Sequence, residues 1–416
     1  MSRNFKLFLG AAVTFYLAGS MNQAAELFVL AGVCLACILG CYIISRLGVE
    51  GLLLRVRPRS GPVWAGKDVE ASIELSNIGL IARPPVSVRV ELRNATVDAP
   101  LEPYLFPLPG LAPGQAVTTT GTVVPACRGE YLLLEPRLIG SDPLGMFDRR
   151  GRPAESSAFV ALPGPVHISR SDMARMLSEQ TRLQMGARRR QTGEFFGIRQ
   201  HEPGDDLRHV HWKVAAHTGR LVVKQYADGR DYHAAVWLDT RAQSVVGSGL
   251  GSSFETQVIA AASLLDALSE TNLEIELYGE GLPGALQSAD RGRSAYERAL
   301  FALARVRPAG ERSFAANTGD WAGFARHGAT VFALTSGIEP AAIATLASLP
   351  FRGIGLRVII CGADAPEEQS AAQLEAERRL RAAGVPTVFA ASPERLHRAF
   401  GELAALRASR GSGVPT

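Results

Sequence analysis

Two apolar runs open the chain and predict helices that lie in a membrane. The second run, residues 27–44, has no charged side chain and approaches the roughly 20 residues that a helix needs to cross the hydrocarbon core. The first run, residues 7–19, is shorter and also resembles a signal-peptide core, with small residues at 18–20 as a cleavage site. We therefore expect residues 1–48 to form a transmembrane helical hairpin, or a single helix after cleavage.

Positive charges around these runs predict the orientation of the chain. The turn at residues 20–26 contains no Lys or Arg, whereas Arg46, Arg55, Arg57 and Arg59 follow the second run. Cytoplasmic flanks of membrane helices carry an excess of Lys and Arg. The bulk of the chain is therefore expected in the cytoplasm, at the inner face of a cytoplasmic membrane.

From about residue 49 to residue 165 the pattern is that of β-strands. Hydrophobic and polar residues alternate in residues 69–75 and 86–92, and turns rich in Gly and Pro separate such runs. Short strands at this spacing favour an all-β, immunoglobulin-like sandwich of two sheets. No acid, base and nucleophile are grouped in this region, which is typical of a spacer or interaction module.

In residues 233–416 the sequence pattern changes to that of apolar strands alternating with helices. Strands are predicted at residues 234–238, 273–278, 330–334, 356–361 and 385–390, and helices at 254–269, 294–305, 341–348, 366–383 and 393–406. This alternation predicts an α/β domain with a doubly wound parallel sheet covered on both faces. Ligands of such folds bind at the carboxyl ends of strands, so Asp239 and Thr335 mark the expected face.

The intervening residues 166–232 are predicted to hold a linker helix, a polar motif segment and a strand near residues 220–226. The motif residues are Arg199, Gly204, Asp205, Asp206, Arg208, His211, Trp212 and Lys213. Asp205 and Asp206 follow a Pro-Gly turn and can accept backbone N–H groups or pair with Arg199 and Arg208. Trp212 is expected to fill a hydrophobic gap. The segment is interpreted as a clamp onto the α/β domain, as a partner-docking surface, or as both.

Composition narrows the class of protein. Lys and Arg number 44 against 40 Asp and Glu, a net charge of +4, which excludes a polycation. Hydrophobic residues are 47% of the chain, which excludes extended disorder, and the 5 cysteines form no disulfide scaffold or zinc spacing. The basic run at 188–190 fits an anionic lipid surface or a solvated charge cluster, and it lacks the aromatic residues expected for nucleic acid.

Three motifs carry a resemblance to a known family. They are Arg128-Gly129-Glu130-Tyr131, Asp142-Pro143-Leu144-Gly145-Met146-Phe147, and residues 199–213 followed by Ala215-Ala216-His217. The chain resembles bacterial proteins of domain-of-unknown-function family fifty-eight, whose C-terminal half is similar to a von Willebrand factor A domain. The resemblance implies a bacterial inner-membrane protein. As partners it implies a MoxR-type AAA+ ATPase and a transglutaminase-like membrane protein.

A von Willebrand factor A domain usually binds a divalent ion through Asp-x-Ser-x-Ser. The matching residues here are Asp239-Thr240-Arg241-Ala242-Gln243, and Thr335-Ser336-Gly337 stands where the family pattern would place a further aspartate. Arg241 brings a positive charge where Mg²⁺ needs an oxygen ligand. Asp239, Thr240 and Thr335 are therefore interpreted as a degenerate metal site, with Mg²⁺ at Asp239 as the alternative, and Asp239 is expected to pair with Arg241 or to cap a turn.

These expectations combine into two hypotheses about function. The first is a membrane-anchored, non-enzymatic interaction or scaffold protein, without metal or other cofactor, that works with the ATPase on client proteins. The alternative is a metal-dependent hydrolase. Its ligands would be imidazole and carboxylate groups of the motif segment, namely His201, Asp205, His209 and His211.

Overall fold

The computed structural model divides the chain into two compact units, Met1–Leu162 and Pro163–Thr416. It describes residues 3–59, 61, 63–177, 195–200, 210, 212–219, 221–226, 233–271, 273–283, 290–325, 328–364 and 368–406. The division falls between Leu162 and Pro163, where the sequence pattern placed a boundary at residue 165. The predicted hairpin and β-region lie together in the first unit.

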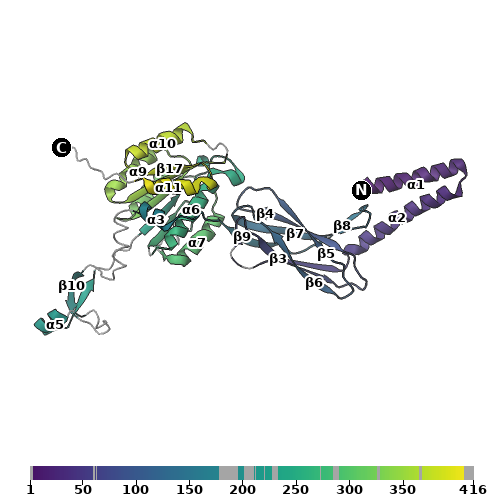
Figure 1. Ribbon diagram of the computed structural model, residues 1–416, viewed down its shortest axis with the longest axis horizontal. Coiled ribbons are helices and arrows are strands. Elements are labelled where there is room, and N and C mark those ends of the chain that lie inside the picture. Colours follow the sequence, from purple (N-terminus) through teal and green to yellow (C-terminus); the bar gives the residue numbers. More distant parts are fainter. Residues whose placement is uncertain are drawn as a thin grey trace. The chain divides into compact units, whose positions relative to one another are not determined.

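The first unit opens with two helices, α1 (Arg3–Asn22) and α2 (Ala25–Val49), which pack against each other as a hairpin (Figure 1). Within the described residues, α2 is the one helix that is long and apolar enough to cross a membrane. Most of its large apolar side chains are exposed. The sequence prediction of an apolar helix that can serve as an anchor agrees with this element.

Two β-sheets enclose one hydrophobic core in the first unit. One sheet has the order β1-β3-β6 and the other the order β2-β9-β7-β4-β5, with β8 paired to β7. The bounds are β1 (Leu52–Pro58), β2 (Val63–Trp64), β3 (Val69–Asn77), β4 (Val86–Asn94), β5 (Glu102–Leu108), β6 (Ala116–Val123), β7 (Gly129–Ser141), β8 (Asp148–Pro153) and β9 (Ser157–Leu162). Alternate residues such as Ile73 of β3 and Val88 of β4 are buried in the shared core, as the period of two predicts.

A six-stranded, mostly parallel sheet forms the centre of the second unit. Its order is β14-β13-β12-β15-β16-β17, and β14 is antiparallel to β13. The bounds are β12 (His233–Leu238), β13 (Glu274–Tyr278), β14 (Asp290–Arg291), β15 (Thr330–Thr335), β16 (Gly355–Cys361) and β17 (Thr387–Ala390). Apart from the short edge strand β14, these elements match the apolar runs predicted from the sequence.

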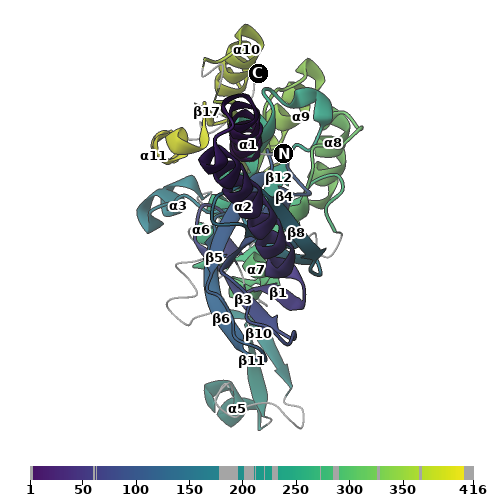
Figure 2. The same ribbon diagram turned by 90° about the vertical axis from the view of Figure 1, so that its right-hand side faces the viewer.

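Helices cover both faces of this sheet, as the alternating pattern predicts. The bounds are α3 (Arg170–Met176), α6 (Ser253–Ser269), α7 (Gly292–Arg305), α8 (Phe314–Phe324), α9 (Pro340–Ser348), α10 (Ala371–Ala382) and α11 (Leu396–Ala405). Ala235 and Trp237 of β12 share a core with α8, α9 and α10. The side of β12 away from α8 and α9 carries α3, α6 and α11 (Figure 2).

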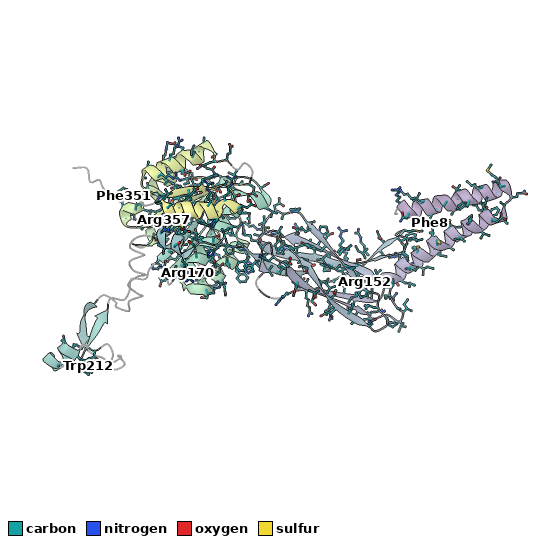
Figure 3. All side chains as sticks on the ribbon, viewed as in Figure 1. Phe8, Arg152, Arg170, Trp212, Phe351 and Arg357 are labelled. Atoms are coloured by element: carbon teal, nitrogen blue, oxygen red, sulfur yellow. The ribbon has the colours of Figure 1, made fainter. Side chains whose placement is uncertain are left out.

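One buried arginine joins two of these helices at their C-terminal ends. Arg357 of β16 (labelled in Figure 3) donates from Nη2 to the carbonyl of Arg175 (2.9 Å) and from Nη1 to that of Leu403 (3.2 Å). It also donates to the carbonyls of Met176 and Leu406. Burial lowers the pKa of Arg357 to about 10. The side chain satisfies main-chain acceptors that α3 and α11 would otherwise leave unpaired.

The motif segment contributes a small sheet and a helix that the sequence pattern did not predict. β10 (Phe195–Gln200) pairs antiparallel with β11 (Val222–Tyr226), which lies within the predicted strand near residues 220–226. The helix α5 (Trp212–Thr218) precedes β11. Short 3-10 turns complete the described elements at Ala242–Ser244, Gly249–Gly251, Pro350–Arg352 and Pro393–Arg395.

Candidate functional site

The site lies where the order of parallel strands reverses, between β12 and β15. These strands are neighbours in register, with Leu238 opposite Leu334, so their carboxyl ends meet at one edge of the sheet. Asp239 follows β12 and Thr335 ends β15, and Thr335 Oγ1 donates to Asp239 Oδ2 at 2.7 Å. The fold thus joins the two residues that the sequence placed on this face. Such a reversal point is where doubly wound sheets hold their ligands.

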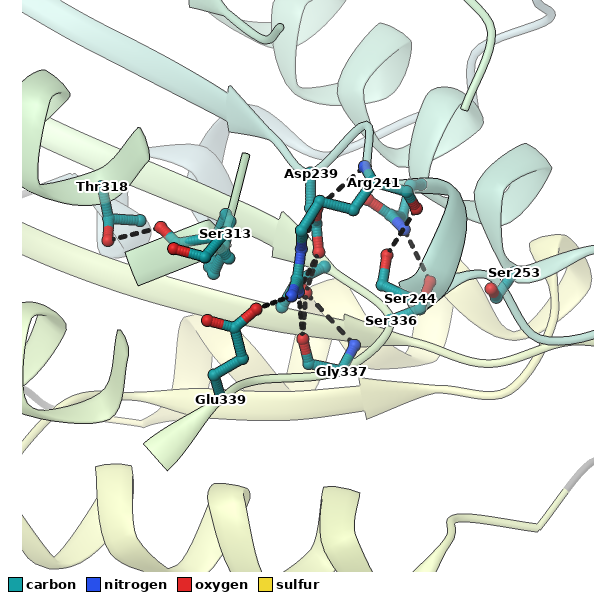
Figure 4. A network of polar contacts seen from close by, with 12 residues as sticks. Asp239, Arg241, Ser244, Ser253, Ser313, Thr318, Ser336, Gly337 and Glu339 are labelled. Atoms are coloured by element: carbon teal, nitrogen blue, oxygen red, sulfur yellow. Dashed lines mark hydrogen bonds and ion pairs between the residues drawn. The ribbon is translucent and has the colours of Figure 1, made fainter. Parts of the chain in front are cut away.

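Arg241 binds both oxygens of the Asp239 carboxylate (Figure 4). Its Nε donates to Oδ1 at 2.9 Å and its Nη2 to Oδ2 at 2.8 Å, and its main-chain N–H donates to Oδ1 at 3.1 Å. The Asp239 side chain is 0% exposed and that of Arg241 10%. The predicted pairing of Asp239 with Arg241 is therefore confirmed, as a buried bidentate ion pair.

The same guanidinium reaches the loop between β15 and α9. Its Nη2 donates to the Gly337 carbonyl at 2.7 Å, and its Nη1 pairs with Glu339, the residue that precedes α9. The guanidinium carbon lies 5.5 Å from the centre of the Phe314 ring. Burial alone would lower the pKa of Arg241, but the Asp239 carboxylate, and then Glu339, raise it above its ordinary value.

Two buried amides hold the backbone around this ion pair. The Gln257 side chain of α6 donates to the main-chain carbonyls of Asp239 and Leu334 (3.1 Å each) and accepts from Ser336 Oγ at 2.6 Å. Gln373 of α10 donates to the Ser336 carbonyl at 2.6 Å. These amides tie the strand ends to helices on opposite faces of the sheet. Glu339, Gln257 and Gln373 were missed from the sequence; the only signal was the amide of Gln257 directly before the mostly apolar part of α6.

The arrangement does not fit a divalent metal ion. Hard cations need several free oxygen ligands, but the guanidinium of Arg241 already binds both Asp239 oxygens. Thr240 points elsewhere, because its Oγ1 donates to the Glu280 carbonyl at 3.1 Å. Across the described part of the chain, no three His, Cys, Asp or Glu side chains gather in a way that could hold a metal ion.

The motif segment is described only in part. Arg199 lies on β10, with its backbone opposite Val223 of β11. Trp212, at the start of α5, is 61% exposed (Figure 3), so it does not fill the hydrophobic gap expected for it. The remaining predicted features lie outside the described residues, namely positions His201, Gly204, Asp205, Asp206, Arg208, His209 and His211 and the side chains of Arg199 and Lys213.

The motif of residues 142–147 forms a capped loop between β7 and β8. The Asp142 carboxylate accepts from the N–H groups of Leu144 (3.0 Å) and Phe147 (2.6 Å). Burial alone would raise the pKa of Asp142, but these hydrogen bonds hold it below its usual range. The loop contacts the helical hairpin, since Asn4 Nδ2 donates to the Leu144 carbonyl at 2.8 Å and the Phe147 ring packs on Phe5.

The motif of residues 128–131 has a structural role in the same unit. Gly129 has a φ of +138°, and a Cβ there would lie 2.5 Å from Asn94 Oδ1. Asn94 Nδ2 donates to the Arg128 carbonyl at 2.8 Å. The Tyr131 ring stacks on Phe159 inside the core. Glycine is required here because only it combines this backbone conformation with so close an approach.

Solved structures similar to this chain have TM-scores near 0.2 and carry no argument about fold or function. An X-ray structure of a Northeast Structural Genomics Consortium target is 13% identical, with 29% of this chain and 94% of that chain covered and a TM-score of 0.21. The CARDB domain of a Pyrococcus furiosus protein in complex with di-metal ions is 20% identical, with 29% and 96% covered and a TM-score of 0.19. A β-glucosidase from Listeria innocua in complex with glucose is 15% identical, with 28% and 17% covered and a TM-score of 0.20.

A family model accounts for the segment that contains the candidate site. No curated protein matches the chain. Residues 197–341 match the family described as Protein of unknown function DUF58. This range includes the motif residues 199–213 and the site residues from Asp239 to Glu339, whereas Gln373 lies beyond it. The match agrees with the resemblance found in the sequence motifs, and residues 197–341 are similar to the DUF58 family.

Proposed function

We propose that this chain is a membrane-anchored, non-enzymatic interaction protein whose α/β domain docks a protein partner at the carboxyl edge of its parallel sheet. The partner proposed from the family resemblance is a MoxR-type AAA+ ATPase, which supplies the energy for assembly or maturation of client proteins. A transglutaminase-like membrane protein is a further proposed neighbour. The chain itself tethers the ATPase or presents the client.

The observation that carries the proposal is the closed ion pair at the strand-order reversal. Asp239 is the one carboxylate that directly follows the central strand β12, and Arg241 and Thr335 engage both of its oxygens. A carboxylate held in this way is not available as a base, a nucleophile or a metal ligand. What remains at this edge is a rigid surface, which suits recognition better than catalysis.

The charges around this edge favour a basic partner surface. Glu280, Glu339 and Asp364 follow the carboxyl ends of β13, β15 and β16. The Glu339 side chain is 35% exposed and Asp364 is exposed, whereas the Arg241 side chain is only 10% exposed. Complementary charge mainly sets specificity and the rate of association, and salt screens it.

The architecture supports the finer assignments of fold. In chain order the strands of the second unit read 3-2-1-4-5-6 across the sheet, with strand 3 antiparallel. This order, with helices on both faces, supports a von Willebrand factor A-like fold. In the first unit two sheets share one core, which supports an immunoglobulin-like sandwich as spacer.

The apolar surface of α2 supports the anchor. Its mean hydropathy is 2.7 over the most apolar window, and its large apolar side chains are mostly exposed. Contiguous apolar surfaces of this extent are rare on proteins surrounded by water. With the positive flank that follows α2, they support the proposal that the two units lie on the cytoplasmic side of the inner membrane.

The experiment is a pull-down with the full chain from detergent extract, analysed by mass spectrometry. The parent is compared with a face variant, Glu339→Gln with Asp364→Asn, and with a control of equal charge change on α10 and α11, Glu375→Gln with Glu402→Gln. We expect an AAA+ ATPase to be enriched with parent and control, and several-fold less with the face variant.

Two outcomes of this experiment contradict the proposal. One is that no AAA+ ATPase is enriched over a control that carries only residues 1–49. The other is that the face variant captures as much ATPase as the parent. Metal analysis of the same preparation tests the alternative hydrolase, since stoichiometric zinc, manganese or iron would favour the ligand set of His201, Asp205, His209 and His211.

A further inference from the structure

Three arginines line a cavity on the outer face of the larger sheet in the first unit. The cavity has a volume of about 410 Å³ and is lined by Arg89 and Glu91 of β4, Glu135 and Arg137 of β7, and Arg150 of β8. It belongs neither to the family segment nor to the edge of the parallel sheet. The arginines come from three neighbouring strands, so the fold itself brings them together.

The register of the strands places like charges against each other. Arg89 of β4 lies directly opposite Arg137 of β7, and Arg150 of β8 is opposite Ile139, two residues further along β7. Like charges at directly opposed positions destabilise a sheet. Three arginines in one cavity therefore destabilise the sheet through repulsion between their positive charges. An anionic ligand bound between them would reduce this repulsion.

Carboxylates neutralise only part of this charge. Arg89 Nη2 pairs with Glu91 at 3.0 Å, and Arg137 pairs with Glu135, in each case within one strand. Among the described residues no carboxylate pairs with Arg150. The side chains of Arg89 and Arg137 are 46% and 40% exposed, so both can reach a ligand. Three positive and two negative side chains leave the cavity with a net charge of +1.

The cavity lies close to the helices of the proposed anchor. Phe147, at the tip of the loop between β7 and β8, packs on Phe5 of α1 and Tyr42 of α2, with ring centres 5.4 and 5.7 Å away. Arg150 follows three residues later, which is about 10 Å along a strand. The headgroup layer on each side of a bilayer is roughly 5–8 Å thick, so a strand that starts at the aromatic contact brings Arg150 to the outer edge of that layer, where its long side chain can reach a headgroup.

We propose that Arg89, Arg137 and Arg150 form a binding pocket for a phosphate group, whose occupant in the membrane is the headgroup of an anionic phospholipid. The lipid assignment rests on the proposed anchor. Guanidinium groups bind phosphate oxygens in a bidentate manner, and a phosphate replaces Glu91 and Glu135 as their partner. Arg152, exposed at the end of β8 (Figure 3), adds to the attraction for anions.

The experiment places the full chain in nanodiscs of phosphatidylcholine and phosphatidylglycerol and measures by native mass spectrometry which lipids stay bound. The pocket variant is Arg89→Gln, Arg137→Gln and Arg150→Gln. The control removes three exposed, ion-paired arginines of the second unit, Arg293→Gln, Arg379→Gln and Arg398→Gln. We expect parent and control to retain phosphatidylglycerol selectively, and the pocket variant to lose roughly fivefold in selectivity per arginine.

A second variant is expected to change lipid retention in the opposite direction. Glu91→Gln with Glu135→Gln frees two guanidinium groups and is expected to raise selective retention of phosphatidylglycerol. Soluble glycerol phosphate, titrated against the detergent-solubilised chain, distinguishes the source of the phosphate. Glycerol phosphate binding that depends on the three arginines supports the phosphate pocket. If the chain at the same time shows no lipid selectivity, the occupant is a free phosphate ester rather than a lipid headgroup.

The pocket is refuted if the pocket variant matches the parent with both lipid and glycerol phosphate. This outcome differs from failure of the anchor. A parent chain that does not enter nanodiscs overturns the membrane proposal and the lipid assignment, and the glycerol phosphate titration then still decides whether the arginines bind phosphate.

Discussion

At the scale of single residues, Asp239 and Arg241 form a buried ion pair in the second unit. Its two charges are removed from water, and the cost is offset by two hydrogen bonds between the charged groups and by further hydrogen bonds to the Gly337 carbonyl and the Thr335 hydroxyl. Removing one partner leaves the other charge buried and uncompensated. Removing both leaves a neutral gap.

Arg241→Met is therefore expected to lower the free energy of unfolding of the second unit by about 3–5 kcal/mol. The double change with Asp239→Asn should cost clearly less than the sum of the single changes. Fluorescence of Trp237 and Trp321, which are buried in the same core, follows the denaturant unfolding. Additive single effects would show that the two side chains are not energetically coupled.

Magnesium is expected to leave the stability of this unit unchanged. A ligand that binds the folded state raises the melting temperature, but Arg241 already engages both Asp239 oxygens. Thermal unfolding with excess Mg²⁺ and with a chelator tests this. A melting temperature that rises with Mg²⁺ in the parent, and not in Asp239→Asn, would reinstate a metal site at Asp239.

Part of this site could be predicted from the sequence, because the end of an apolar run marks the end of a buried strand. Asp239 and Thr335 each follow such a run, so their shared edge could be predicted. Glu339, Gln257 and Gln373 lie in loops and helices, where periodicity does not reveal which side chain turns toward the strand ends. Trp212 was expected in a gap on the basis of its hydrophobicity alone, and its helix α5 leaves it exposed.

At the scale of elements, capping groups decide where segments begin and end. Ser252 accepts from the Glu255 N–H at the start of α6, the arrangement that a Ser-x-x-Glu sequence favours at a helix N-terminus. α8 was not predicted, because Asn317, Gly319 and Gly323 are poor helix formers. Its buried Phe314 and Trp321 hold it against the sheet, so packing outweighs propensity.

The capped loop at Asp142 should make the first unit sensitive to acid. The pKa of Asp142 in the folded chain lies below its ordinary value of 3.8, so its stabilising contribution is present above that value. The contribution is lost as the pH falls through the lower, folded-state pKa. Asp142→Asn is expected to cost about 1–3 kcal/mol near neutral pH, and progressively less below about pH 4.

Denaturant unfolding at a series of pH values, followed by the fluorescence of Trp64 in the first unit, measures this difference. If the difference in unfolding free energy between parent and Asp142→Asn stays constant down to about pH 2, the Asp142 carboxylate is not the group that titrates. Asp148→Asn, at an exposed site in the same strand pair, is the matched control.

At the scale of the whole molecule, the two units are expected to unfold as separate transitions. Each has its own core, one around Ile73 and Val88 and the other around Trp237 and Val331. Chains with several cores depart from two-state behaviour. Arg241→Met should move only the transition seen by Trp237, and Asp142→Asn only that seen by Trp64. A single transition that both variants shift equally would contradict the division.

The broad order of the fold could be predicted because each region has its own period. Alternation by two gave the β-region, and continuous apolar strands between helices gave the parallel sheet. The short strands β8 and β14 could not be predicted, since Asp148–Pro153 contains no large apolar residue and Asp290–Arg291 is too short to have a period. Their position depends on pairing with longer neighbours.

The bidentate contact between Asp239 and Arg241 also limits which substitutions these two positions can accept during evolution. Neither residue can be replaced alone without stranding a charge in the interior, so substitutions at the two positions should arise together in related chains. A lineage that loses the arginine must either lose the aspartate or acquire another cation beside it. In an alignment of related sequences, the residues at positions 239 and 241 should therefore change together. The neighbouring Thr240 is hydrogen-bonded elsewhere, so its position should vary independently of both.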